Sequence, residues 1–339
     1  MKKILWIDLM KGLGMLTVVA GHIYGGEISR NIFIFHMPLF FFISGYLLKP
    51  TLEYKKYFTK KAVHLLIPYF SFLIPMYVVL MGFPSLNIKE IIIYISRPII
   101  GGRFLVGAFG VFWFVTCLFL TQQIMNYLIN KLNSKKLLLL MLSMLIVSYS
   151  NTYVFPKIWF PWNANVIFAS APIFYIGYIY KERTFKMNNV LLTILGISVV
   201  LFSFTYPENV YDMKSAKYGI PIITLISSLI LILNIKFISV KLSNYKFSYR
   251  VLSEIGKASM VIMYLHQPIQ MLTNSSFSTN TLIDATIRFF TATILSYVIY
   301  LVLSKFKFGK ALFLGSYKDL EEIFRPLIKR NKALKANKV

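Results

Sequence analysis

The stretch GHIYGGEISRNIFIFHMPLFFFISGYLLKP, residues 21–50, places two histidines beside apolar runs on either side of a short polar interruption. His22 ends a run that begins near residue 5, and His36 lies near the start of a run that reaches residue 49. Apolar runs of this length are typical of helices that enter a lipid bilayer. The stretch therefore predicts a hairpin of two membrane helices, each with an imidazole at about the same depth.

The composition of the whole chain agrees with this prediction. Of its 339 residues, 57% are hydrophobic and only 14% are charged, and the mean hydropathy is +0.65. These values exclude an ordinary soluble domain. The formal charge of +25 would suggest a nucleic-acid partner, but Lys and Arg occur in short clusters between apolar stretches and form no continuous basic face. We therefore expect an all-α integral membrane protein without a nucleic-acid partner.

Ten segments are close to the roughly 20 apolar residues that a spanning helix needs. They lie near residues 5–24, 33–49, 62–81, 106–128, 137–152, 165–180, 190–206, 219–236, 256–273 and 283–304. The fifth and sixth are short, and residues 82–105 leave room for a re-entrant piece. Nine or eleven spans therefore remain open beside the expected ten.

The basic residues predict the orientation, because cytoplasmic loops of membrane proteins are enriched in Lys and Arg. With the N-terminus inside, the outer loops keep only Arg30, Lys89, Arg97, Arg103, Lys157, Lys214 and Lys217. An even number of spans then places both termini in the cytoplasm. Asp8 and Lys11 interrupt the first run and no small-residue cleavage site follows, so we expect an uncleaved first helix.

The chain is predicted to have two parts, a membrane-embedded unit over residues 1–304 and a basic cytoplasmic tail over residues 305–339. The tail contains DLEEIFRPLIKRNK, residues 319–332, whose pattern suits a helix on the inner leaflet. The single cysteine, Cys117, lies within an apolar span. It excludes an intrachain disulfide and makes a thiolate metal site implausible, so no metal is expected.

Ionisable side chains within membrane helices are functional candidates, because burying them in lipid is costly. Asp8, Lys11 and His22 fall on one stripe of the first helix with Gly12 and Met15. Lys11 and His22 are then separated by about 16 Å along the helix axis. One helix thus carries a charged pair near the cytoplasm and an imidazole near the outer surface.

His22 and His36 are predicted to flank one polar cavity near the outer surface. A neutral imidazole is well suited to accept a proton near pH 7. The other interpretation is that each histidine bonds a backbone carbonyl and caps a helix end at the interface.

WIDLMKGLGMLTVVAGH (6–22) and FHMPLFFFISGYL (35–47) resemble the opening of the membrane acyltransferase 3 family. The resemblance is strongest to its carbohydrate O-acetyltransferases, in the fucose 4-O-acetylase-like branch. It covers residues 6–304 and continues through KKAVHLLIPYF (60–70), VFWFVTCLF (111–119), FYIGYIY (174–180) and IGKASMVIMYLHQPI (255–269).

The resemblance implies transfer of an acyl group, usually from cytoplasmic acetyl-CoA, to a hydroxyl of a surface or capsular polysaccharide or its lipid-linked precursor. It implies a multi-pass protein of the bacterial cytoplasmic membrane, with no permanently bound cofactor. The family's essential histidine maps onto His22. The family's basic pair maps onto Lys61 and His64, where two arginines are usual, and Lys60 is a further candidate for binding the CoA phosphates.

His22 is the expected base, because a sugar hydroxyl needs to lose its proton as it attacks a thioester. Lys11, His36, Ser44 and the backbone N–H groups around Gly45 all remain candidates for stabilising the oxyanion. Lys11 also lies on the expected path of the donor, and Gly12 is predicted to border the channel for the pantetheine arm.

Trp113 and His266 match elements of the family, FWF and YLHQP, with helix packing as the other interpretation of each. A transporter, flippase or polymerase of glycans is the competing class. Such a protein should scatter ionisable groups over several spans at the midplane. Here they concentrate on the first helix and at the ends of the hairpin, which favours an enzyme.

Overall fold

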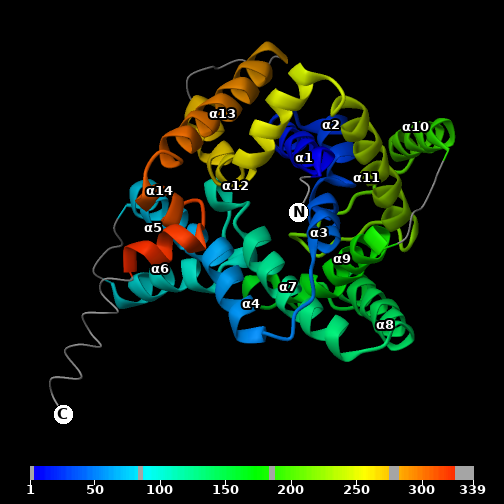
Figure 1. Ribbon diagram of the computed structural model, residues 1–339, viewed down its shortest axis with the longest axis horizontal. Helices are drawn as coiled ribbons and strands as arrows, with labels where there is room; N and C mark the ends of the chain where they lie inside the picture. Colours follow the sequence, from blue (N-terminus) through cyan, green and yellow to red (C-terminus); the bar gives the residue numbers. More distant parts are fainter. Residues whose placement is uncertain (1–3, 83–86, 183–187, 275–281, 325–339) are drawn as a thin grey trace.

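The computed structural model describes residues 4–82, 87–182, 188–274 and 282–324 (Figure 1). This part of the chain is helical, with one isolated β-bridge between Asp212 and Lys217 and no β-strand among the described residues. The predicted all-α fold is confirmed. The longer helices are α1 (Leu5–Ile23), α3 (His36–Leu47), α5 (Ile67–Met81), α6 (Ile88–Ile100), α7 (Trp113–Lys131), α8 (Ser134–Tyr153), α9 (Ile167–Glu182), α10 (Asn189–Thr205), α11 (Ile223–Leu242), α12 (Lys246–Asn274) and α13 (Leu282–Leu303).

Short helical segments connect or extend these helices. They are α2 (Gly26–Phe33), α4 (Tyr54–Lys61), the π-helical turn η1 (Ala62–Leu66), the 3₁₀ turns η2 (Gly102–Phe104), η3 (Gly107–Phe109) and η4 (Pro161–Val166), and α14 (Lys307–Leu312). Residues 25–32, the polar interruption between the first two apolar runs, mostly form α2. Most of the region 82–105 forms α6 and η2.

Each of the ten predicted spans coincides with a helix. Six segments of the described chain are long and apolar enough to cross a membrane, namely Gly26–Leu47, Tyr54–Met81, Gly107–Lys131, Ser134–Tyr153, Ile223–Leu242 and Leu282–Leu303. Two of the remaining helices, α9 and α10, have only 16 and 17 residues, and α1 and α12 carry charged and polar side chains. The chain therefore has the helices of a multi-pass membrane protein.

Asparagine side chains define where several helices begin. The Asn133 side chain accepts a hydrogen bond from the backbone N–H of Lys136 at the start of α8. Asn188 accepts one from Val190 at the start of α10. Each bond satisfies an N–H group that the first turn of a helix leaves unpaired. The local sequence thus determines where these two helices begin.

Glycines allow two pairs of helices to pack at backbone distance. Gly12 of α1 and Gly256 of α12 face each other, and a side chain on Gly12 would strike the carbonyl of Leu252. A side chain on Gly45 of α3 would strike the carbonyl of Phe174 in α9, and one on Gly177 of α9 would strike the carbonyl of Phe42 in α3. Small residues commonly bring helices together in membranes, where the lipid supplies no hydrophobic driving force between them. The first seam holds α1 in place beside α12.

The first helix lies between α12 and α11, as Figure 1 shows. Near the other end of the chain, α14 lies beside α5, and the rings of Phe313 and Phe72 are 5.0 Å apart. Part of the predicted basic tail therefore packs against the membrane-helix bundle. The amphipathic pattern over residues 319–332 falls largely outside the described residues.

Candidate functional site

A cavity of about 340 Å³ lies beside the C-terminal end of α1, and we call it the histidine pocket. This volume is typical of pockets that hold small molecules. His22 from α1, His36 from α3 and Trp113 from α7 line it, as the sequence predicted for the two histidines. The rings of His22 and His36 are 6.5 Å apart, between centroids. The hairpin therefore does bring its two imidazoles to one cavity.

His22 is held by two glutamines of α12. The Gln267 carboxamide lies 3.3 Å from Nδ1 of His22, and Gln270 Nε2 donates to the His22 carbonyl at 3.4 Å. With Nδ1 engaged, Nε2 is the ring nitrogen left for a substrate. For Nε2 to accept a proton, Nδ1 must carry the hydrogen and donate it to the carboxamide oxygen. A carboxamide can present either atom, since its oxygen and nitrogen are nearly isosteric.

His36 and His266 are bonded differently from His22. The Nδ1 atom of His36 lies 3.1 Å from the carbonyl of Ile32, and that of His266 lies 2.9 Å from the carbonyl of Ile262. A carbonyl only accepts, so both rings carry their proton on Nδ1. The capping interpretation thus applies to His36 but not to His22. His266 is fully buried, and its ring centroid is 5.4 Å from that of His22.

The segment between α10 and α11 contributes polar groups that no motif in the sequence predicted at this site. Tyr211, Asp212, Lys214 and Ser215 line the histidine pocket. Lys214 Nζ donates to the Leu105 carbonyl at 2.8 Å, which fixes the segment against the turn before α7. Lys214 is one of the few basic residues assigned to outer loops. Because basic residues are rare there, its presence was the one feature of the sequence that could have marked it as a site residue.

Two polar atoms of this pocket are buried and have no hydrogen-bond partner among the described residues. They are the carboxamide atom of Gln267 that is not next to His22 and the hydroxyl oxygen of Tyr211. Buried polar atoms are usually paired, since leaving one unpaired costs about 1–3 kcal/mol. A ligand rich in hydroxyl groups would supply the missing partners.

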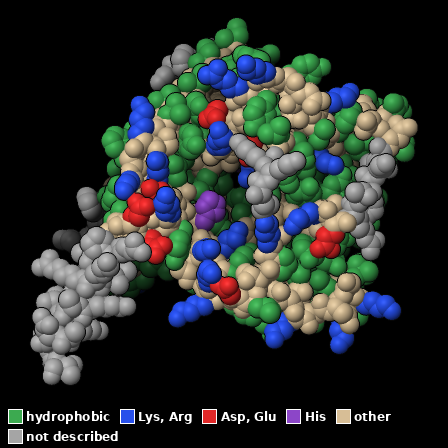
Figure 2. Space-filling model, in the orientation of Figure 1, with side chains coloured by type: hydrophobic (Ala, Val, Ile, Leu, Met, Phe, Trp, Pro, Cys, Tyr) green, Lys and Arg blue, Asp and Glu red, His purple; other side chains and the backbone are tan. Residues whose placement is uncertain are grey.

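A second cavity of about 400 Å³ lies beside the N-terminal half of α1, and we call it the lysine pocket. Lys11, Ser44, Lys49, Lys61 and His64 line it. Figure 2 shows a hollow on this face of the molecule, with a histidine inside it and Lys or Arg side chains around it. The arrangement offers positive charge to an anionic ligand.

The turn η1 determines how the lysine pocket is lined. A π-helical turn inserts an extra residue into a helix and is frequent at functional sites. Here it covers Ala62–Leu66 and directs Lys61, His64 and Leu65 to the same cavity. Lys61 Nζ lies 5.5 Å from the centroid of the Tyr57 ring, within the range of a cation–π contact. No pattern in the sequence predicted this turn.

Several predicted residues occupy places other than those expected. Ser44 accepts a hydrogen bond from Gln122 at 2.7 Å in the lysine pocket, away from His22. Lys60 is exposed and does not line either pocket, and neither does Asp8.

The predicted place of Gly12 beside a donor channel is wrong, since Gly12 is buried against the backbone of α12. The physical reason is the turn of the helix. Lys11, Met15, Val18 and His22 face the pockets, and Gly12 lies about 100° further round the axis from Lys11.

The two pockets meet within the helix bundle. Four residues line both of them, one from each of α1, α3, α7 and α12: Met15, Phe40, Phe114 and Met263. We call these four residues the neck. The described residues contain no group of His, Cys, Asp and Glu side chains arranged to hold a metal ion. The site thus offers histidine chemistry at one end of the neck and cationic binding at the other.

Comparison with known protein families identifies the family of this chain. A family model described as an acyltransferase domain, that of the acyltransferase 3 family, matches residues 4–304. The protein therefore belongs to this family, and it is a membrane acyltransferase. No curated protein and no solved structure matches the chain significantly.

Proposed function

We propose that the protein transfers an acetyl group from acetyl-CoA to a hydroxyl group of a carbohydrate, as a member of the O-acetyltransferase branch of its family. The acceptor is a surface or capsular polysaccharide or its lipid-linked precursor. The single observation that carries this proposal is the meeting of the two pockets at the neck, with His22 on one side and Lys11, Lys61 and His64 on the other.

The lysine pocket is the proposed binding site of the donor. The phosphates of CoA need cations, and Lys11 and Lys61 supply them on the side that the basic loops mark as cytoplasmic. Lysine binds phosphate as a point charge, without the paired hydrogen bonds of arginine. We assign His64 to the same pocket as a hydrogen-bonding group rather than as a permanent charge.

The histidine pocket is the proposed site of the reaction and of the acceptor. The acceptor hydroxyl gives its proton to Nε2 of His22 while its oxygen attacks the thioester carbonyl. The tetrahedral intermediate then collapses, the carbon–sulfur bond breaks, and the CoA thiolate takes a proton from the imidazolium. The unpaired hydroxyl of Tyr211 and the unpaired carboxamide atom of Gln267 support an acceptor with several hydroxyl groups.

The membrane arrangement is part of the proposal. Ten helices cross the bilayer, both termini are cytoplasmic, and the protein resides in the bacterial cytoplasmic membrane. Residues 1–304 form the catalytic unit and residues 305–339 the cytoplasmic tail. Under this arrangement the acyl group passes from the inner to the outer side through the neck.

Mass spectrometry of the surface polysaccharide tests the proposal directly. Cells with the gene should carry acetyl substituents that mild base removes, and cells without the gene should lack them. Identical acetylation in both would overturn the proposal. A glycan that disappears from the surface, instead of losing only acetyl groups, would support the competing class of flippase or polymerase.

A further inference from the structure

The four residues of the neck form an apolar boundary between the two pockets. Its four side chains are apolar, and three of them, Met15, Phe114 and Met263, are buried. The rings of Phe40 and Phe114 lie 5.9 Å apart, between centroids. Gly14 leaves room for Phe40, because a side chain there would approach the Phe40 ring at 3.3 Å. The boundary between the two pockets is therefore formed by apolar side chains from four helices.

The position of the neck has a consequence for the donor. If CoA binds in the lysine pocket and His22 acts in the histidine pocket, the acyl group must pass the neck before its carbonyl reaches His22. The end of the pantetheine arm next to the thioester is an unbranched chain. A passage that fits this arm admits an unbranched acyl group of similar cross-section and meets a branched one with a steric clash.

Building on the proposed function, we infer that Met15, Phe40, Phe114 and Met263 select the acyl group by its cross-section. Unbranched acyl groups pass, and branched ones are excluded. The length of an unbranched acyl group is limited instead by the volume of the histidine pocket.

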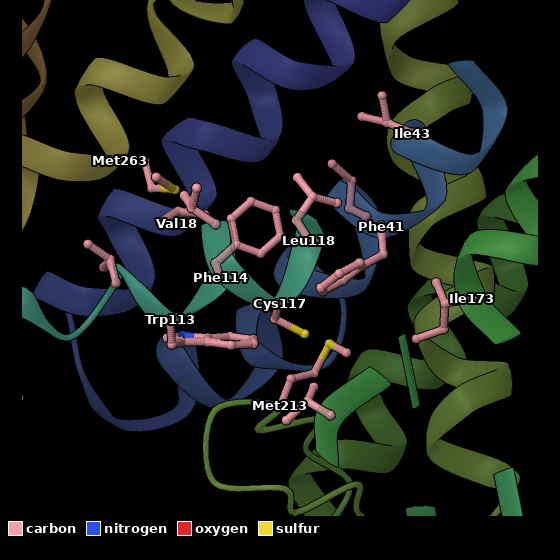
Figure 3. Close-up of a cluster of buried hydrophobic side chains, with 14 of the residues drawn as sticks. Val18, Phe41, Ile43, Trp113, Phe114, Cys117, Leu118, Ile173, Met213 and Met263 are labelled. Atoms are coloured by element: carbon pink, nitrogen blue, oxygen red, sulfur yellow. The ribbon is translucent and has the colours of Figure 1, made fainter. Parts of the chain in front are cut away.

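The chemistry of the neck side chains suits this role. Figure 3 shows Met263 and Val18 beside the ring of Phe114. The methionines are unbranched and adapt their shape, whereas the two aromatic rings are rigid. The two rigid rings limit the width of the neck. The two methionine side chains can adjust to the unbranched chain that passes between the rings. In a hydrophobic passage one additional methyl group changes the preference of an enzyme about 10-fold to 200-fold.

Two isomeric donors test the inference without a change in composition. Butyryl-CoA and isobutyryl-CoA contain the same atoms and differ only in branching. Inverted membrane vesicles from cells that make the protein are given each radiolabelled donor, and base-labile label in the carbohydrate fraction is counted. Wild-type vesicles should favour butyryl over isobutyryl at least about tenfold. Met263→Ala and Phe114→Leu should bring that ratio to within about twofold of one.

Matched control variants separate the neck from general effects on packing. Met144 of α8 is buried to the same degree as Met263 but lines neither pocket, and Phe119 lies on the same helix as Phe114. Met144→Ala and Phe119→Leu should leave the isomer ratio unchanged. The same ratio in wild type, neck variants and controls would overturn the inference, as would transfer of neither isomer by any of them.

A variant with a larger side chain in the neck keeps the inference testable if Met263→Ala and Phe114→Leu do not yield folded protein. Met263→Phe should lower acetyl transfer at least tenfold while its abundance in membrane fractions stays near that of wild type. Unchanged transfer by a folded Met263→Phe protein would also overturn the inference. The proposed function fails separately, if wild-type vesicles transfer no label from acetyl-CoA, and the inference then fails with it.

Discussion

The histidine pocket and the lysine pocket differ in how their polar side chains are held. In the histidine pocket, Gln267 contacts His22 and a backbone carbonyl binds His36. In the lysine pocket, Lys61 lies over an aromatic ring and His64 is exposed. Fixed orientation is what proton transfer needs, whereas long-range attraction of phosphates needs charge more than geometry. The difference indicates that chemistry and donor binding are separate tasks along one helix.

The largest expected effect comes from breaking the seam that positions both pockets. Gly12→Leu places a large side chain against the backbone of α12, which cannot move aside. We expect loss of folded protein, since overpacking a core typically costs about 1–3 kcal/mol or more. Immunoblots of membrane fractions measure the abundance.

Leu13→Met is the control for this prediction, because Leu13 is half-buried and the exchange conserves volume. It should leave abundance near wild type. A Gly12→Leu protein of normal abundance would contradict the packing role of Gly12.

The next effect should separate chemistry from binding. His22→Ala removes the proposed base, and general base catalysis contributes about 10²-fold to 10⁴-fold. We expect glycan acetylation to fall by that factor, while the purified protein still binds acetyl-CoA with wild-type affinity. Mass spectrometry of the glycan and a binding titration measure the two quantities. A parallel loss of donor affinity would contradict the assignment of the two tasks to different pockets.

Lys60 and Lys61 allow donor binding to be tested with a matched control, because the two lysines are adjacent and only Lys61 lines the pocket. Lys61→Ala should raise the KM for acetyl-CoA about tenfold, because a charge-assisted hydrogen bond contributes roughly 1.5–3 kcal/mol. Lys60→Ala removes an equal charge from an exposed position outside the pocket and should change KM less than twofold. Equal effects of the two changes would mean that the CoA phosphates are drawn only by the overall charge of the surface.

The smallest expected effect concerns the orientation of His22. Gln267→Leu removes the carboxamide next to Nδ1 but leaves the imidazole in place. We expect kcat to fall about tenfold with the KM for acetyl-CoA unchanged, because the base is less well positioned. Gln267→Glu should restore much of kcat, because the carboxylate accepts a hydrogen bond from Nδ1–H of His22. It should also alter the pH–rate profile. Equal activity of all three proteins would show that Gln267 does not orient His22.

The part of the site that the sequence predicted is local along the chain. His22 and His36 reach one cavity because they end and begin neighbouring helices joined by a short segment. Lys11 was found from its place within the first apolar run, and Lys61 from the family resemblance of the stretch KKAVHLLIPYF. Gln267 was not predicted, because it lies 245 residues from His22 in the sequence. Its local sequence pattern also resembles that of other polar residues of α12. Its one signal was its position beside His266 in YLHQP.

The sequence by itself determined the helices, the membrane class and the family resemblance, because each of these follows from hydrophobic runs and short motifs within the chain. Only the tertiary structure decided which faces of the helices meet. A stripe gives the angle of a residue around its helix but not the neighbour at that angle, so Gly12 was assigned to a channel and proved to contact α12. The same holds for the π-helical turn at His64 and for Lys214, whose places depend on how distant segments share space and hydrogen bonds.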